Sequence, residues 1–266
     1  MPAILLSRLK IQTVRLAELI PTPDLFARSL RTILEYYSDR THRPGQSGEP
    51  PPLLPAYNVP HPVLRQILRE LAPQLSVDQS KGLAICDALW RQEQFECRLL
   101  AARILGLLPV EPLEPVYERL LVWVQEDEER VLNELLTHGL TRWRKEAPTS
   151  YLVRLGEWLK SSSFNEQKLG LKALLPLIED PSFNNLPVLF RLLNPLVRVA
   201  PSPIRPDILP VLRSLAKRSP NETAFYLRQN MTAQDTPWLT RKVLAEFSAS
   251  LQLSLREAMK DPGLEF

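Results

Sequence analysis

The use of proline most constrains the fold of this 266-residue chain, which has 26 prolines and only 8 glycines. An all-β protein of this length needs glycine in many of its turns, because glycine reaches backbone angles that other residues avoid. The prolines instead stand before, or in the first turn of, apolar runs with helical spacing, where the missing N–H breaks no hydrogen bond. Examples are Pro62, Pro112, Pro115, Pro148, Pro187, Pro203 and Pro237. The pattern predicts an all-α protein.

The apolar runs are short and repetitive. In one of them, Phe95, Leu99 and Ile104 lie on one side of a helical wheel, while Glu96 and Arg98 lie elsewhere. Runs of about 12 to 18 residues with short connections favour antiparallel helix pairs. The pairs recur about every 35 to 40 residues, near the period of HEAT and armadillo repeats. We therefore expect a right-handed α-solenoid of HEAT-like antiparallel helix pairs.

The domain prediction rests on one stretch that is too rich in Pro, Gly and Ser to form a helix. It covers residues 39–60 and indicates an extended, partly flexible surface loop between helical parts, not a boundary between independent folds. We predict a helical pair over residues 1–38, the connecting loop over 39–60 and the HEAT-like array over 61–266.

Several classes of function are excluded by the sequence. No apolar run reaches the roughly 20 residues that cross a bilayer, and charged residues interrupt the N-terminal segment where a signal peptide has its apolar core. Cys86 and Cys97 match no zinc spacing and lie among apolar residues, which indicates buried thiols. Phosphate-loop, metalloprotease and hydrolase motifs are absent from the sequence. We expect a cytoplasmic protein that uses no membrane, metal or cofactor.

Charge is distributed unevenly, although the net charge is only +3. Residues 183–260 hold 11 Lys and Arg against 5 Asp and Glu, which gives +6. Residues 111–134 hold 2 basic against 8 acidic residues, which gives −6. A basic C-terminal third suits a polyanionic partner such as nucleic acid.

Five cations of the basic third are candidate phosphate contacts. Arg213 and Lys217 are four residues apart, so they share a face if they are helical, and Arg218 follows directly. Arg241 and Lys242 follow a proline–tryptophan pair at the opening of a predicted helix, where backbone N–H groups can bind phosphate together with them. The alternative is a solubilising helix face.

Five motifs carry a resemblance to a known family. They are Tyr57-Asn58-Val59-Pro60-His61-Pro62-Val63-Leu64-Arg65, Ala88-Leu89-Trp90, Glu96-x-Arg98-x-x-Ala101, Leu155-Gly156-Glu157-Trp158 with the following Ser161 to Lys168, and Leu212-Arg213 with Lys217 and Pro220. In this order they resemble motifs of the DNA alkylation repair (AlkD-like) family, which comprises bacterial alkylpurine DNA glycosylases built from HEAT-like repeats. The resemblance covers roughly residues 57–260.

The resemblance implies a concave, basic surface that holds double-stranded DNA containing an alkylated purine. The implied reaction is hydrolysis of the N-glycosidic bond. Alkylation at N3 or N7 makes the base a good leaving group, so the enzyme mainly has to stabilise an oxocarbenium-like sugar. The family is understood to use two Trp, one Asp and one Arg in the cleft, and a carboxylate and indole faces suit that positive charge.

The chain departs from the family's pattern at several of these positions. The family's arginine pair aligns with Gln167 and Lys168, so a positive charge remains but the guanidinium fork is lost. Pro210 stands where the family has its second Trp. One alignment places the acid at Asn133, which carries no charge. The resemblance therefore implies a divergent member with an eroded catalytic set.

A shifted alignment offers Trp123, Asp127 and Lys168 as the catalytic set. The spacing of Trp123 and Asp127 would place them on one face of a helix. Each also has a simpler interpretation. Trp123 lies in an apolar stripe typical of a core, Asp127 lies in the acidic run 126–129 typical of a solvated face, and Lys168 is also a candidate phosphate contact or an ordinary surface lysine.

Two functions remain open on the sequence. The first is a DNA-binding relative of the alkylpurine glycosylases that excises or recognises alkylated bases. The second is a non-catalytic HEAT-like scaffold that binds a protein partner through its concave face. A HEAT-like chaperone or lyase subunit is a third interpretation.

Overall fold

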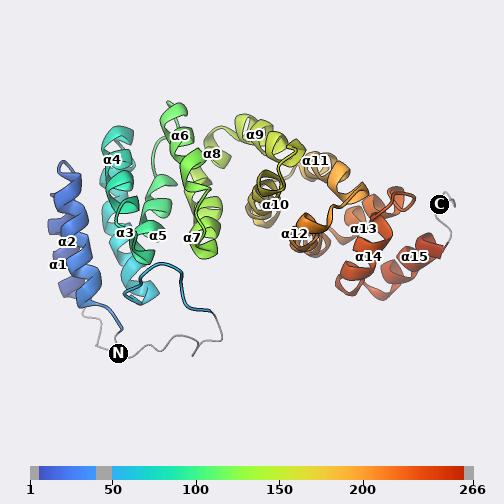
Figure 1. Ribbon diagram of the computed structural model, residues 1–266, viewed down its shortest axis with the longest axis horizontal. Coiled ribbons are helices and arrows are strands. Elements are labelled where there is room, and N and C mark those ends of the chain that lie inside the picture. Colours follow the sequence, from blue (N-terminus) through green and yellow to red (C-terminus); the bar gives the residue numbers. More distant parts are fainter. Residues whose placement is uncertain (1–5, 40–49, 261–266) are drawn as a thin grey trace. The chain divides into compact units, whose positions relative to one another are not determined.

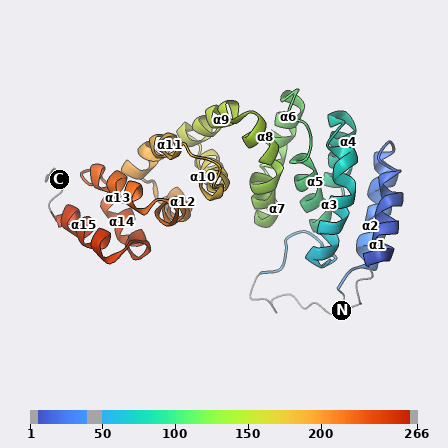
Figure 2. The same ribbon diagram turned by 180° about the vertical axis from the view of Figure 1, so that it is seen from behind.

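The computed structural model describes residues 6–39 and 50–260, and every regular element in these ranges is a helix (Figure 1; Figure 2). The prediction of an all-α protein is confirmed. In the same two ranges, no helix has the length and apolar character needed to cross a membrane. Contacts between residues divide the chain into two compact units, Met1–Pro148 and Thr149–Phe266.

The first unit consists of helices that lie side by side (Figure 1; Figure 2). They are α1 (Leu6–Ala17), α2 (Pro23–Tyr36), α3 (His61–Leu75), α4 (Gln79–Trp90), α5 (Phe95–Leu105), α6 (Glu114–Trp123), α7 (Glu129–Glu134), the π-helix Leu135–Gly139 and α8 (Thr141–Glu146). α1 packs against α3, α2 against α4, and α3 and α4 against α5. Three of these contacts, α1 with α3, α2 with α4 and α3 with α5, join helices two places apart in the chain, a pattern typical of layered helical hairpins.

The second unit has the same kind of contacts. Its elements are α9 (Pro148–Lys160), α10 (Phe164–Glu179), α11 (Leu186–Arg198), the 3₁₀ turn Ser202–Ile204, α12 (Arg205–Arg218), α13 (Pro220–Gln229), α14 (Thr236–Val243), the 3₁₀ turn Leu244–Glu246 and α15 (Ala249–Lys260). α10 packs against α12, α12 against α13 and α14, and α13 against α15. α12 is therefore central to this unit.

Proline opens many of the helices, as the sequence predicts. It occupies the first or second position of α2, α3, α6, α11, α12, α13 and α14. Proline fits there because the first N–H groups of a helix have no partner inside the helix. Pro210 is an exception, because it lies inside α12.

The described part of the connecting segment is tied to the first unit. No helix is formed between Tyr36 and His61 in its described residues, and residues 40–49 of the predicted loop lie outside these. The buried carboxylate of Glu96 accepts the backbone N–H groups of Tyr57, at 3.0 Å, and Val59, at 3.2 Å. Two motifs that are far apart in the sequence are thus joined, and the C-terminal end of the connecting segment is held by hydrogen bonds to Glu96.

Candidate nucleic-acid interface

The last turns of α12 carry two exposed cations that meet one carboxylate. Lys217 lies in the last turn, where the negative end of the helix dipole favours a positive charge. Arg213 Nε lies 3.8 Å and Lys217 Nζ 3.9 Å from the carboxylate of Glu246, which belongs to the 3₁₀ turn after α14. The two side chains therefore share a face of α12, as their spacing predicts. Ion pairs this long and this exposed are weak, so both cations can exchange Glu246 for a phosphate.

The end of α14 adds two more cations next to that turn. Arg241 and Lys242 are exposed and lie in the last turn of α14, which ends at Val243. The expectation that they lie at a helix opening with free N–H groups is wrong, because the helix has only 8 residues and a 3₁₀ turn follows it. Any phosphate here is bound by side-chain charge. We call Arg213, Lys217, Arg241 and Lys242 the cationic surface.

An indole supports this end of α14. Lys242 Nζ lies 5.6 Å and Arg205 Cζ 5.0 Å from the ring of the half-buried Trp238. The guanidinium of Arg205 also donates to the buried Asp235, at 2.7 Å. Cation–π contacts hold positive charge near a ring at little desolvation cost. The Trp238 ring therefore contacts Lys242, one residue of the cationic surface, while Asp235 holds Arg205 on the same ring.

Arg218 performs a different task from its neighbour Lys217. Its guanidinium donates to four backbone carbonyls at the end of α10 and just beyond it, those of Leu177, Ile178, Asp180 and Phe183. The last carbonyls of a helix have no partner inside the helix, and a basic side chain satisfies them. The side chain proposed as a phosphate contact thus has its donors directed at the protein's own backbone.

Lys168 lies in the first part of α10 and is half-buried. Among the residues that the structure describes, its ammonium group makes no hydrogen bond or ion pair. Its neighbour Gln167 donates to the carbonyl of Ser161 at 2.7 Å and holds the turn that leads into α10. Of the two residues aligned with the family's arginine pair, Gln167 therefore stabilises a turn, and Lys168 is available to a ligand.

Trp123 and Asp127 do not share a helix. Trp123 is the last residue of α6, and Asp127 lies exposed in the connection before α7. The Trp123 ring is 4% exposed and stacks on Trp90, with centroids 4.2 Å apart and planes at 3°. The expected common face is wrong because the helix ends too early, and the stacked indole belongs to the core of the first unit.

The acidic run 126–129 is largely engaged by the protein itself. Glu126 pairs with Arg98. The buried carboxylate of Glu128 accepts the Leu53 N–H at 2.6 Å and the Arg130 guanidinium at 3.0 Å. Burial alone would raise the pKa of Glu128, but these hydrogen bonds outweigh it and leave the pKa below its ordinary value. The expected solvated face is thus limited: only Asp127 is both exposed and without a recorded partner in the described part of the run.

The sequence did not single out three residues of this region. Glu246 is a lone carboxylate in a basic stretch, and only the packing of α12 against the turn after α14 brings it to Arg213 and Lys217. Arg205 and Trp238 are 33 residues apart in the sequence, and their contact depends on the same packing. A proline–tryptophan pair at a helix start was the available signal for Trp238.

The two cysteines offer no reactive thiol. Cys86 and Cys97 are buried and unpaired. Burial raises the pKa of both thiols, that of Cys97 to about 12, so neither is a thiolate at neutral pH. Within residues 6–39 and 50–260, no three His, Cys, Asp or Glu side chains are grouped closely enough to hold a metal ion.

Comparison with known proteins gives one match. The family model described as DNA alkylation repair enzyme matches residues 34–260. No curated protein and no solved structure matches the chain significantly. The matched range includes α3 to α15 and therefore the whole cationic surface.

Proposed function

Because the chain belongs to the family of DNA alkylation repair enzymes, we propose that it binds duplex DNA through the cationic surface of its second unit. The observation that carries the proposal is that two exposed cations of α12 meet the carboxylate of Glu246, while α14, which directly precedes the turn of that residue, carries two more exposed cations. Such a surface contacts phosphates and binds independently of base sequence. Lys168, on a helix that packs against α12, is a further phosphate contact in this proposal.

The proposed architecture is a right-handed solenoid of HEAT-like antiparallel pairs. Contacts between helices two places apart in the chain, present in both units, support it. In such an array, side chains from successive hairpins line one surface, which is how repeat proteins bind long partners. The C-terminal ends of α12 and α14 then present their cations to the same DNA backbone.

Four substitutions test the DNA proposal. The test variant changes Arg213, Lys217, Arg241 and Lys242 to Gln, and a control variant changes Lys10, Arg28, Arg65 and Arg69 to Gln. The control residues are exposed cations of the first unit, so both variants lose the same charge. Fluorescence anisotropy with a labelled duplex should show at least about tenfold weaker binding for the test variant and a small change for the control. Equal losses would mean that net charge alone attracts the DNA and would favour the protein-scaffold alternative.

Glu246 should act against DNA binding. Its carboxylate forms ion pairs with Arg213 and Lys217 and repels an approaching phosphate. Glu246→Gln is expected to increase duplex affinity about threefold at low salt, with the gain fading as salt screens the charge. Glu222→Gln is the matched control, since Glu222 is an exposed carboxylate on α13. An equal gain in both variants would show that Glu246 has no special place at the surface.

The proposed chemistry is excision of an alkylated base. Water adds to C1′ of the sugar and loses a proton to the solvent. The C1′–N bond breaks with its electron pair going to the base, and the cationic base leaves as a neutral purine. A carboxylate near the sugar stabilises the oxocarbenium-like transition state. We assign this carboxylate to Asp127, because it is exposed and its neighbours Glu126 and Glu128 are paired.

Asp127→Asn should lower the release of N7-methylguanine from duplex DNA by at least about 100-fold, because the amide cannot stabilise a cationic sugar. Asp127 is exposed, so the substitution should leave the fold intact, and a melting curve checks this. Glu129→Gln, two residues further on, is the control. Release at an unchanged rate would exclude Asp127 as the stabilising carboxylate. If the unmodified protein releases no base, lesion recognition remains as the function.

A further inference from the structure

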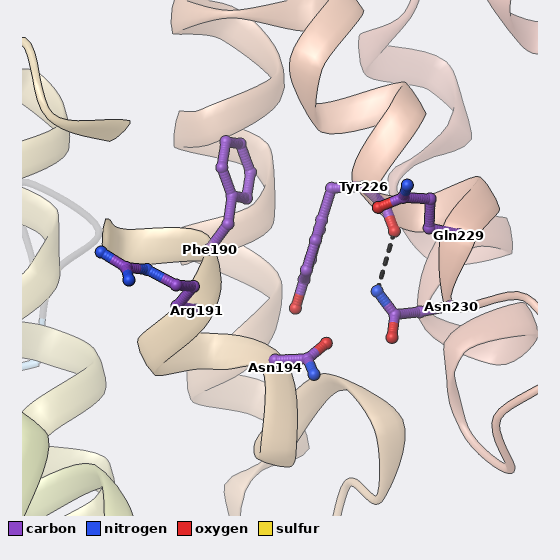
Figure 3. Close-up of a pocket in the computed structure, with 6 residues that line it drawn as sticks. All are labelled: Phe190, Arg191, Asn194, Tyr226, Gln229 and Asn230. Carbon is purple, nitrogen blue, oxygen red and sulfur yellow. Dashed lines mark hydrogen bonds between the residues drawn. The ribbon is translucent and has the colours of Figure 1, made fainter. Parts of the chain in front are cut away.

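A pocket of about 530 Å³ lies between α11 and α13 in the second unit (Figure 3). α11 supplies Phe190, Arg191 and Asn194, α13 supplies Tyr226 and Gln229, and Asn230 directly follows α13. The volume is in the range of pockets that hold small organic ligands. None of these six residues belongs to the cationic surface.

Tyr226 brings a buried, unpaired hydroxyl to this pocket. The residue is 7% exposed, and its hydroxyl makes no hydrogen bond within the part of the chain that the structure describes. Figure 3 shows the hydroxyl directed toward Asn194. The two other buried tyrosines in the described residues behave differently, since Tyr37 donates to the side-chain oxygen of Gln12 and Tyr151 to the carbonyl of Ala173, both at 3.0 Å. An unpaired buried donor is costly and marks a place where a ligand supplies the missing acceptor.

The other lining side chains are an aromatic ring, three carboxamides and a guanidinium. The Phe190 and Tyr226 rings lie 4.9 Å apart, inclined by 36°. The half-buried Asn230 donates to the Tyr226 carbonyl at 3.0 Å, which leaves its side-chain oxygen as an acceptor. Arg191 is exposed, and the six lining residues include no carboxylate. Burial also raises the pKa of Tyr226, so the hydroxyl remains a donor at neutral pH.

We propose that this pocket binds a nucleotide, with its base against Phe190 and Tyr226 and its phosphate at Arg191. Aromatic rings bind the faces of any base. The carboxamides of Asn194 and Asn230 carry both donors and acceptors, as base edges do, and the Tyr226 hydroxyl donates to a ring nitrogen or carbonyl. The exposed guanidinium of Arg191 matches a phosphate. The nucleotide is either free in solution or extruded from a DNA strand.

The first arm of the test uses no DNA, so it does not depend on the proposed function. Each of the four 2′-deoxynucleoside 5′-monophosphates is titrated into the full-length protein by calorimetry. At least one should bind, and the corresponding nucleoside should bind about tenfold more weakly, because it lacks the phosphate. Tyr226→Phe and Arg191→Gln should each weaken binding about tenfold, while the controls Tyr36→Phe and Arg256→Gln, at exposed positions, should not. Tyr226→Phe removes an unpaired group, so its melting temperature should not fall.

The second arm, which rests on the proposed function, identifies the source of the nucleotide. A duplex with 2-aminopurine opposite an abasic site is added to the wild type and to Tyr226→Phe. If the fluorescence rises with the wild type but not with Tyr226→Phe, the pocket binds a base extruded from the duplex. Nucleotide binding that depends on Tyr226, without this fluorescence change, assigns a free nucleotide. The proposal is overturned if no monophosphate binds and the two proteins give the same fluorescence, even when both bind the duplex.

Discussion

Gly106→Ala is expected to destabilise the first unit by about 3 kcal/mol or more. A Cβ atom at this position would lie 1.9 Å from the carbonyl oxygen of His138 and 3.2 Å from Cα of Gly139. Both contacts are with backbone atoms, which cannot rotate away as the end of a side chain can. α5 and the π-helix Leu135–Gly139 pack against each other here, so relief requires the two elements to separate.

Urea denaturation followed by circular dichroism measures this effect, and Gly156→Ala provides the control. There the added Cβ would meet only the end of the Leu192 side chain, at 3.2 Å, inside helix α9. Because alanine is a better helix former than glycine, this variant should be within about 1 kcal/mol of the wild type. Similar stabilities for both variants would disprove the close approach of the two backbones.

Arg218→Ala is expected to lose about 3 kcal/mol of stability and to leave DNA affinity nearly unchanged. Lys217→Ala should weaken DNA binding and leave the stability nearly unchanged. Arg218 satisfies carbonyls at the end of α10, and its removal leaves part-buried acceptors without donors. The Lys217 side chain is 71% exposed, and its only recorded ion pair, among the described residues, is the one to Glu246 at 3.9 Å. Exposed pairs of this kind contribute about 1 kcal/mol or less.

Thermal melts and anisotropy titrations of the two single variants measure both properties. The variants change adjacent residues and remove one positive charge each, so each serves as the control for the other. If Arg218→Ala loses as much DNA affinity as Lys217→Ala while remaining folded, then Arg218 contacts phosphate and the assignment to the end of α10 is wrong.

The sequence predicted the helical class because proline position and apolar spacing are local signals. It also predicted that Arg213 and Lys217 share a face, since both lie in one uninterrupted helix. It could not separate Lys217 from Arg218. The two side chains have the same charge, and only the packing of α10 against α12 places carbonyls beside one of them.

The failures have a similar origin. The spacing of Trp123 and Asp127 predicts a common face only if the helix continues, and α6 ends at Trp123. The order of the motifs indicated ancestry but not contact. The hydrogen bonds from Tyr57 and Val59 to Glu96 join residues nearly 40 positions apart, and they exist because α5 lies beside the end of the connecting segment.

The salt dependence of duplex binding tests the central claim most directly, because each phosphate contact releases counterions. The logarithm of the affinity is measured against the logarithm of the salt concentration, for the wild type and for the variant with the four cations of the cationic surface changed to Gln. Loss of four contacts predicts a slope shallower by about 3.6. Parallel lines for the two proteins would contradict the account, since they would mean that the DNA phosphates bind elsewhere.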